Sequence, residues 1–361
     1  MTTTPISFAI IGTAGVPASY GGFETLAENL VAECGSGITV YCSSKSIDNK
    51  ISSYKGAELV YLPFRANGIQ SVIYDSTALF HAAFRNQINI LLLGVSGAIC
   101  IPLVKLFFKR VNIITNIDGF EWNRAKWGRL ARAFLKFSEY CAVRYSDRVI
   151  ADNKVIGDYV ENNYGRECEV IAYGGDHVQV VRQTHRQNDT PYALSVCRIE
   201  PENNLDLILC AFSAANQRLI AIGNWADSAY GRQLHAKYRN SLTLELLDPI
   251  YDPETLGRYR SNCQLYVHGH SAGGTNPSLV EMMHHGKAIA AFDCNFNRET
   301  TENQCHFFKD SDSLASLLST GSIFSDKSTG IAMQEIANRR YTWKKIRTLY
   351  FDLMEPGSAP A

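Results

Sequence analysis

Short apolar segments alternate with amphipathic segments along the whole chain, and this alternation constrains the fold more than any other feature. In the first part, apolar segments occupy residues 7–12, 38–42, 58–62, 89–94, 112–118 and 148–153, and helical patterns occupy 23–33 and 73–85. Continuous apolar strands separated by helices are typical of a parallel sheet that helices cover on both faces. The pattern therefore predicts a doubly wound α/β domain.

A second series of the same kind begins near Tyr192. Its strands are expected at 192–196, 218–223, 242–247, 264–269 and 287–293, and its helices at 205–215, 253–262, 277–285 and 310–319. We therefore predict two doubly wound, Rossmann-like domains, 1–175 and 176–335, that face each other across a cleft. A last helix is expected at about 331–354, so that residues 336–361 cross back to the first domain and end in a tail.

The apolar stretch 88–108 is long enough to resemble a membrane-spanning helix. Gly94, Gly97 and Pro102 interrupt it, so a strand, a turn and a helix are expected instead. The N-terminus lacks the basic start of a signal peptide. Ten cysteines without a C-x-x-C pair indicate reduced thiols in the cytoplasm. Lys plus Arg and Asp plus Glu both number 35, which argues against a nucleic-acid partner.

A glycine-rich loop, residues 12–24 (GTAGVPASYGGFE), joins the first strand to the first helix. Backbone amides at such a helix start can bind an anion, so Gly21 and Gly22 are predicted to contact the phosphates or sugar of a ligand. The alternative is a turn that needs a positive φ. The loop does not match G-x-G-x-x-G, and the second strand ends without an acidic residue, which argues against an NAD-dependent dehydrogenase.

A second glycine-rich turn, residues 273–281 (GGTNPSLVE), also leads from a strand into a helix. Pro at the first helical position leaves amides exposed toward a ligand, and Glu281 one turn later can accept hydrogen bonds from ribose hydroxyls. The alternative for Glu281 is a solvent-facing helix residue. The residues predicted to bind a nucleotide here are Gly274, Thr275, Asn276, Pro277, Ser278 and Glu281.

Arg198 follows the strand 192–196, where its guanidinium is expected to bind a diphosphate; the alternative is a surface ion pair. After the strand 112–118, two carboxylates, two indoles and two cations leave the sheet together, an arrangement suited to sugar rings and their hydroxyls. The alternative is that the indoles belong to the core and the cations are solvated. The residues predicted to bind an acceptor are Tyr20, Glu121, Trp122, Arg124 and Lys126.

Residues 269–273 match G-x-S-x-G, the nucleophile elbow of α/β-hydrolases. A triad with Ser271 would need Asp293 and His306, which are too close in sequence to span the intervening helix and strand. An esterase is therefore not expected. Four histidines, at 268, 270, 284 and 285, lack carboxylates at ligand spacing, so no metal site is predicted.

The chain resembles GT-B glycosyltransferases of family 4, and within them a rhamnosyltransferase-like subgroup whose N-terminal half is catalogued as a domain of unknown function. The matching stretches include GTAGVPASYGGFETLAENL, NIDGFEWNRAKWGRLAR, YVHGHSAGGTNPSLVEMM and RYTWKKIRTLY. The resemblance implies a retaining transferase that needs no metal or other cofactor and binds its nucleotide-sugar donor mainly on the second domain. It implies rhamnose from dTDP-rhamnose as the sugar, and catalytic roles for Asp118, Arg198 and Glu281.

Three positions depart from the pattern of many family-4 enzymes. Gly273 stands where those enzymes carry a first glutamate, Asn203 stands where they carry a lysine, and Asp118 replaces an acceptor-side histidine. The subgroup shares these departures, so an active enzyme is expected. The alternative is a protein of the same fold that binds a nucleotide sugar without turning it over.

Cations are concentrated in one part of the first domain, where residues 124–148 contain seven Lys or Arg and two acids. Lys105, Lys109 and Arg110 precede them, beside Leu106, Phe107 and Phe108. This suits an anionic membrane surface. We therefore expect a cytoplasmic enzyme attached peripherally to the inner face of the plasma membrane. Its acceptor is expected to be a lipid-diphosphate-linked or free glycan in bacterial surface-polysaccharide synthesis. The alternative is that the Phe side chains belong to the core and the cations are solvated.

Overall fold

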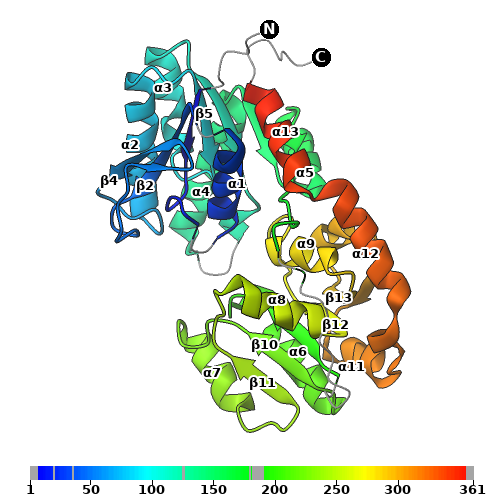
Figure 1. Cartoon of the computed structure of the whole chain (residues 1–361). Coiled ribbons are helices and arrows are strands. Elements are labelled where there is room, and N and C mark those ends of the chain that lie inside the picture. The colour runs from blue at the N-terminus through cyan, green and yellow to red at the C-terminus, as the bar shows by residue number, and fades with distance from the viewer. Residues whose placement is uncertain are drawn as a thin grey trace. The chain divides into compact units, whose positions relative to one another are not determined.

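The computed structural model describes residues 7–18, 21–34, 36–123, 127–178, 180 and 191–354 (Figure 1). The chain divides into two compact units. Unit one contains the residues up to 172 together with those from 344 onward, and unit two contains residues 173–343. Each unit is a parallel sheet with helices on both faces, so the predicted pair of doubly wound α/β folds is confirmed.

Unit one contains an eight-stranded sheet among its described residues, in the order β3-β4-β2-β1-β5-β6-β7-β8. Only the pair β3–β4 is antiparallel within this sheet. The apolar runs of the central strands are fully buried, as expected for a sheet covered on both faces. The strands are β1 (Phe8–Ile11), β2 (Ile38–Ser43), β3 (Ser53–Tyr54), β4 (Ala57–Leu62), β5 (Asn89–Leu93), β6 (Asn112–Asn116), β7 (Arg148–Ala151) and β8 (Glu169–Val170).

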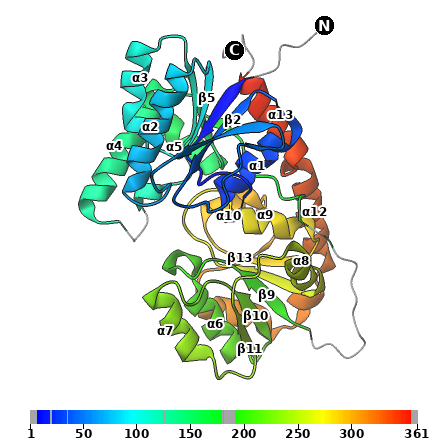
Figure 2. The same ribbon diagram turned by 60° about the vertical axis from the view of Figure 1, so that its left-hand side comes forward.

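The helices of unit one lie in two layers. They are α1 (Gly22–Cys34), α2 (Gln70–Phe84), α3 (Ile101–Phe107), α4 (Arg129–Tyr145), α5 (Lys154–Tyr164) and α13 (Trp343–Met354). The helices α2, α3 and α4 cover one face of the sheet, and α1 and α13 cover the other (Figure 2). The C-terminal helix is tied to two strands: Phe351 packs edge-on against Phe8, and Asn116 donates a hydrogen bond of 2.8 Å to the Tyr350 hydroxyl.

Unit two contains a six-stranded parallel sheet in the order β11-β10-β9-β12-β13-β14. Its strands are β9 (Ala193–Val196), β10 (Leu219–Ile222), β11 (Leu244–Leu247), β12 (Leu265–His268), β13 (Ala288–Phe292) and β14 (His306–Phe308). Its helices are α6 (Leu205–Ala214), α7 (Ala229–Tyr238), α8 (Pro253–Asn262), α9 (Pro277–His284), α10 (Asn295–Thr300), α11 (Ser311–Ser319) and α12 (Lys327–Arg340). The pairs α6–α11 and α9–α12 are in contact on opposite faces of the sheet.

The apolar stretch 88–108 folds as predicted into β5, a turn and α3, with a short 3-10 helix (Ala98–Cys100) before α3. Within the described ranges, no helix has both the length and the apolar character needed to cross a membrane.

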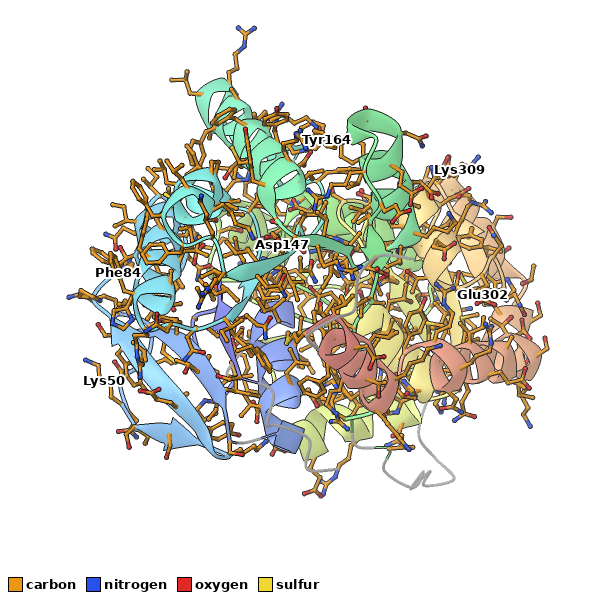
Figure 3. All side chains as sticks on the ribbon, turned by 90° about the horizontal axis from the view of Figure 1, so that it is seen from above. Lys50, Phe84, Asp147, Tyr164, Glu302 and Lys309 are labelled. Atoms are coloured by element: carbon orange, nitrogen blue, oxygen red, sulfur yellow. The ribbon has the colours of Figure 1, made fainter. Side chains whose placement is uncertain are left out.

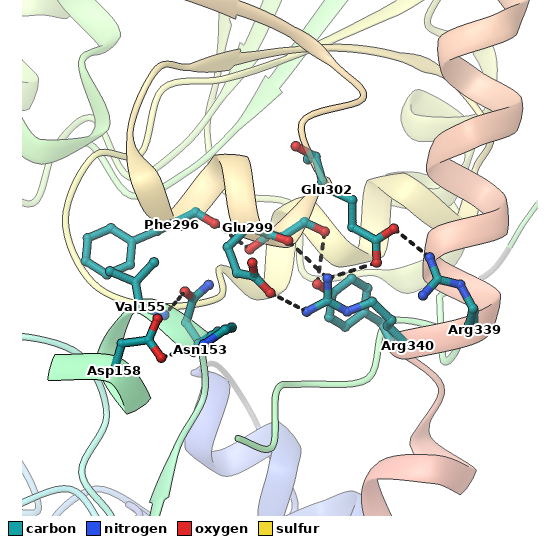
Figure 4. Close-up of polar contacts among 12 residues, drawn as sticks. Asn153, Val155, Asp158, Phe296, Glu299, Glu302, Arg339 and Arg340 are labelled. Carbon is teal, nitrogen blue, oxygen red and sulfur yellow. Dashed lines mark hydrogen bonds and ion pairs between the residues drawn. The ribbon is translucent and has the colours of Figure 1, made fainter. Parts of the chain in front are cut away.

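The prediction of a single helix at 331–354 is wrong, because the chain forms two helices there: α12 ends at Arg340 and α13 begins at Trp343. The carbonyl of Tyr341 turns out of the helix and bonds the Gly175 amide at 2.8 Å and the His284 ring at 3.0 Å. The end of α12 is also fixed to unit two, since Arg339 and Arg340 pair with Glu302, and Arg340 also with Glu299 (Figure 4).

Candidate active site

The carboxyl ends of β9 and β12 form the topological switch point of unit two. Chain order reverses between these two neighbouring strands, and ligands of open α/β sheets bind at such a point. Arg198 follows β9, and the loop 269–276 follows β12. The two loops are linked through Asn203, whose side chain donates to the Arg198 carbonyl at 2.7 Å and bonds the His270 ring at 2.8 Å. The structure therefore links the loop that carries Arg198 to the loop 269–276, which contains the glycine-rich turn.

The turn 273–276 leads into α9 in the way the sequence predicts. Gly273 has a φ of +102°, which a residue with a side chain rarely adopts. Asn276 caps the helix by accepting a hydrogen bond of 3.0 Å from the Ser278 amide, and Pro277 takes the first helical position. Gly274 and Thr275 complete the turn, so the five predicted residues surround one helix N-terminus. The positive end of the helix dipole there favours an anion.

Glu281 is largely buried and held by two partners. Its side chain is 14% exposed and forms an ion pair with Arg260 of α8. Its other oxygen, Oε1, lies 3.4 Å from Nε2 of His177. The alternative of a solvent-facing helix residue is therefore wrong. Sequence reasoning missed Arg260 and His177. For His177 the sequence offers one signal, the G-G-D-H stretch 174–177 at the predicted domain boundary, and for Arg260 it offers none.

Ser271 has no nucleophile geometry. Its hydroxyl donates to the Glu202 carbonyl at 3.0 Å, and its amide bonds the same carbonyl at 2.9 Å. The two residues that a triad would need pair elsewhere: Asp293 with Arg298, and His306 with Asp326. The rejection of the esterase is confirmed. In the part of the chain that the structure describes, no three His, Cys, Asp or Glu residues gather in a way that could hold a metal ion.

The glycine-rich loop of unit one is tied down by carboxylates of its own helix. The Ala14 amide donates to Glu24 at 2.8 Å, and the Ala18 amide donates to Glu28 at 2.8 Å. Burial raises the pKa of Glu24 against the effect of the Ala14 hydrogen bond. Gly21 has a φ of +126°, and a Cβ there would lie 2.0 Å from a Glu24 oxygen. Gly21 therefore requires its positive φ, and the amides of Ala14 and Ala18 already have acceptors on α1.

The predicted acceptor residues of unit one follow β6. Asp118 adopts a left-handed backbone with a φ of +60°, and its amide bonds the Asn116 side chain at 2.9 Å. Residues forced into such conformations concentrate at functional sites. Glu121 accepts a hydrogen bond of 3.0 Å from the Trp127 indole.

The indole of Trp122 is part of a cluster around the buried carboxylate of Glu139. Its Nε1 donates to Glu139 at 2.8 Å, and the ammonium of Lys136 lies 4.4 Å from the ring centre. The hydroxyls of Tyr159 and Tyr164 donate to the same carboxylate. Trp122 therefore anchors the loop after β6, and its contact with a sugar stays a prediction. Tyr20, Arg124 and Lys126 lie outside the described residues.

Two family descriptions match the chain, one on each half. Residues 6–176 match the Domain of unknown function (DUF1972), and residues 179–318 match Glycosyl transferases group 1. No curated protein is similar enough in sequence to count as a match. Solved structures share the fold over nearly the whole chain. Sucrose-phosphate synthase from Thermosynechococcus elongatus has a TM-score of 0.80 at 16% identity, covering 96% of this chain and 98% of its own.

The chain is a GT-B glycosyltransferase. Two further similar structures hold nucleotides. HepE of Anabaena in complex with UDP has a TM-score of 0.71 at 14% identity, covering 96% of this chain and 98% of its own. The catalytic domain of starch synthase IV from Arabidopsis thaliana, bound to ADP and acarbose, has a TM-score of 0.72 at 11% identity, with coverages of 97% and 99%.

The group 1 match covers the part of this glycosyltransferase that carries the switch point of unit two. Arg198, the turn 273–276 and Glu281 all fall within residues 179–318, as does Arg260. His177 lies just outside that range. The candidate donor site of the glycosyltransferase therefore lies in unit two.

Proposed function

We propose that this glycosyltransferase transfers rhamnose from dTDP-rhamnose, with retention of configuration and without a metal. The observation that carries the donor site is the convergence of Arg198, the N-terminus of α9 and Glu281 at the switch point between β9 and β12. Binding of a nucleoside diphosphate by structures of the same fold, UDP in HepE and ADP in the starch synthase, supports a donor of this class. Rhamnose rests on the resemblance of the sequence motifs.

Each group of the proposed donor site has a distinct role. Arg198, with 41% of its side chain exposed, provides charged donors to the diphosphate, and the α9 amides add the helix dipole. Together they stabilise the negative charge that grows on the departing nucleoside diphosphate. Glu281 accepts hydrogen bonds from the ribose hydroxyls. Gly21 and Gly22 at the start of α1 are proposed as further diphosphate contacts, and Asp118 as the acceptor-side carboxylate.

Unit one carries the surface that we propose for a lipid-linked acceptor in bacterial surface-polysaccharide synthesis. Apolar side chains are exposed on α2, α3 and α4. Helix α3 contacts both α2 and α4. Phe84 lies at the outer edge of α2 (Figure 3). Phe107 is 70% exposed and Leu130 89%, which argues against the alternative that Phe107 is core; Phe108, in contrast, packs against Phe84. We call this surface the basic apolar face; it consists of Leu103, Leu106, Phe107, Lys109, Arg110, Arg129, Leu130, Arg132, Phe137, Tyr140 and Arg144.

The cations of this face suit anionic lipid headgroups. Among the described residues, no carboxylate forms an ion pair with Lys109, Arg110, Arg129, Arg132 or Arg144. Lys105, Lys136 and Arg148 are different, because each is paired with an acid, Asp147, Glu139 and Glu169 respectively. Five cations that pair with none of the described carboxylates, beside exposed apolar side chains, support peripheral attachment of the cytoplasmic enzyme to the inner face of the plasma membrane.

A donor screen tests the proposed activity. The purified enzyme is incubated with dTDP-rhamnose, UDP-glucose or UDP-galactose, and release of nucleoside diphosphate and thermal stabilisation are both measured. We expect dTDP-rhamnose to raise the melting temperature and to be consumed when a lipid-linked glycan is added. Use of the UDP-hexoses and not of dTDP-rhamnose would overturn the choice of sugar. Stabilisation by a nucleotide sugar without turnover, over a range of acceptors, would favour the non-catalytic binding protein.

A further inference from the structure

The segment Gly174–His177 is wedged between Trp343 and helix α9. An added Cβ at Gly174 would lie 2.6 Å from Cδ2 of Trp343. An added Cβ at Gly175 would lie 2.7 Å from the Val280 carbonyl and 2.9 Å from the Glu281 amide. Contacts this short leave no room for a side chain at either position. The two glycines therefore let the segment lie directly against the backbone that carries Glu281.

The ring of His177, which this segment carries, is oriented by Trp343. The indole Nε1 of Trp343 donates a hydrogen bond of 2.9 Å to Nδ1 of His177, and the Trp343 amide donates to Asp176 at 2.7 Å. Because an indole N–H can only donate, Nδ1 of His177 is an acceptor and the ring proton of the neutral histidine resides on Nε2. Burial lowers the pKa of His177, so the ring is neutral at pH 7.

The proton on Nε2 faces the carboxylate of Glu281. Nε2 lies 3.4 Å from Oε1 of Glu281, and Arg260 bonds the other oxygen, Oε2. Arg260 is itself 7% exposed, so its contact with the carboxylate is shielded from water. With a donor on each oxygen, the plane of the carboxylate is fixed, which leaves lone pairs on both oxygens in a defined direction. A pair of neighbouring ribose hydroxyls needs that arrangement of acceptors.

We propose that His177 is a positioning residue for the donor site: with Trp343 it holds Oε1 of Glu281 in the orientation that receives the ribose of the nucleotide sugar. The inference rests on the proposed role of Glu281 in donor binding. Beyond that role, we infer that the orientation of the Glu281 carboxylate depends on the two segments through which the chain enters and leaves unit two. These segments, at Tyr173 and Trp343, are the ends of unit two and are bonded to each other by Gly175 and Tyr341.

If His177 has this role, the affinity for the nucleotide depends on the protonation state and the tautomer of the His177 ring. The charged and titratable groups that face His177 are Glu281, Arg260, Asp176 and His284. In the wild type, the Trp343 indole keeps the proton on Nε2. Without that indole, Nδ1 can take the proton, and Nε2 then presents a lone pair to the carboxylate. The variant Trp343→Phe should therefore gain affinity as the pH falls and the ring acquires both protons.

The test measures the affinity for dTDP alone by titration calorimetry, in five single variants and one double variant of the full chain. His177→Leu removes the donor and should weaken binding about tenfold, whereas His177→Gln can still donate and should remain within about threefold of the wild type. Trp343→Phe should weaken binding at pH 8 and recover as the pH is lowered into the range where the His177 ring takes up its second proton. With the proposed donor as substrate, KM should rise for His177→Leu while kcat at saturation changes less than twofold.

His235→Leu is the matched control. His235 also lies beside a tryptophan, Trp225, at the same ring separation of 5.9 Å, but that indole donates to the Leu247 carbonyl. This variant should bind dTDP as the wild type does. The folding of His177→Leu is checked by its urea transition. If it does not fold, Trp343→Phe and His177→Gln still test the proposal, because the dTDP affinity of Trp343→Phe must depend on pH and that of His177→Gln must not.

Glu281→Gln separates this inference from the proposed function on which it rests. If Glu281→Gln leaves the dTDP affinity unchanged, the proposed donor role of Glu281 is wrong. If Glu281→Gln weakens binding and His177→Leu and Trp343→Phe do not, the positioning role is wrong and the donor role stands. In the Glu281→Gln background, His177→Leu should have no further effect; a full tenfold loss there would show that His177 acts independently of the carboxylate.

Discussion

Arg198 and Arg218 have similar surroundings but lie at opposite ends of their strands. Their side chains are 41% and 40% exposed, and each lies near a glutamate, Glu200 at 3.5 Å and Glu245 at 3.1 Å. They differ in place: Arg198 follows the carboxyl end of β9, whereas Arg218 precedes the first residue of β10. Only the carboxyl ends of the strands meet a ligand in folds of this kind.

Replacing Arg198 with alanine should therefore weaken nucleoside diphosphate binding by about 1.5–3 kcal/mol, the value of a charge-assisted hydrogen bond. Arg218→Ala should leave the affinity unchanged, and titration calorimetry with dTDP measures both. Equal affinities for the two variants would place Arg198 outside the site.

Two buried histidines give the folded chain a predictable response to acid. Burial lowers the pKa of His268 and of His285 to about 3, whereas a histidine in an unfolded chain titrates near 6.5. Between these values the unfolded state binds more protons, so the free energy of unfolding falls as the pH decreases. From pH 7 to pH 5 each histidine should cost about 2 kcal/mol.

Urea unfolding of His285→Gln at pH 7 and pH 5 checks this prediction. The loss of stability between the two pH values should be smaller than in the wild type by about the contribution of one histidine, ~2 kcal/mol. His235→Gln, at a half-buried position, should leave the difference as in the wild type. An unchanged difference in His285→Gln would contradict the assignment.

At the scale of elements, most strands and most helices were predictable, because a buried parallel strand is largely apolar and can be recognised from its own sequence. The short strands β3, β8 and β14 were not. The break between α12 and α13 was not. The residues on both sides of Tyr341 suit a helix, and the break depends on the Gly175 amide and the His284 ring, which are distant in sequence.

The candidate site shows the same division between what the sequence reveals and what only the folded chain provides. The turn 273–276 and the cap of α9 were predictable, since glycine, asparagine and proline have local conformational reasons to be there. The partners of Glu281 were not, because Arg260 and His177 reach it from α8 and from the segment before residue 180.

Gly175→Ala tests the packing of that segment on α9. The added methyl would lie 2.7 Å from the Val280 carbonyl, so either the segment or the helix must shift. We expect a loss of about 1–3 kcal/mol in the free energy of unfolding, measured by urea titration. Gly128→Ala is the control, because a Cβ there meets nothing within 4 Å, and it should change the stability by less than about 1 kcal/mol.

At the scale of the whole molecule, the chain has no net charge, with 35 cations and 35 acids, but the basic apolar face carries an excess of cations. Its exposed apolar side chains and its five cations are both on unit one. A neutral protein with one basic face should bind anionic vesicles in one orientation, and its binding should weaken with salt.

Sedimentation with phosphatidylglycerol vesicles tests this at low and high salt. The double variant Arg129→Glu/Arg132→Glu should bind at least about tenfold more weakly, since each arginine near an anionic surface contributes about 1 kcal/mol. Arg239→Glu/Lys327→Glu on unit two makes the same change in net charge and should bind as the wild type does. No binding of the wild type at low salt would disprove attachment through this face.

The return of α13 to unit one has a consequence for the order in which the protein is made. Tyr350 is fully buried and is bonded to Asn116, and Phe351 packs on Phe8, so unit one is completed by residues that are translated after the whole of unit two. Unit two, which is continuous in sequence, has all its strands available before α13 emerges. During synthesis the sheet of unit one therefore lacks the contacts of α13 with β1 and β6 until unit two has been translated.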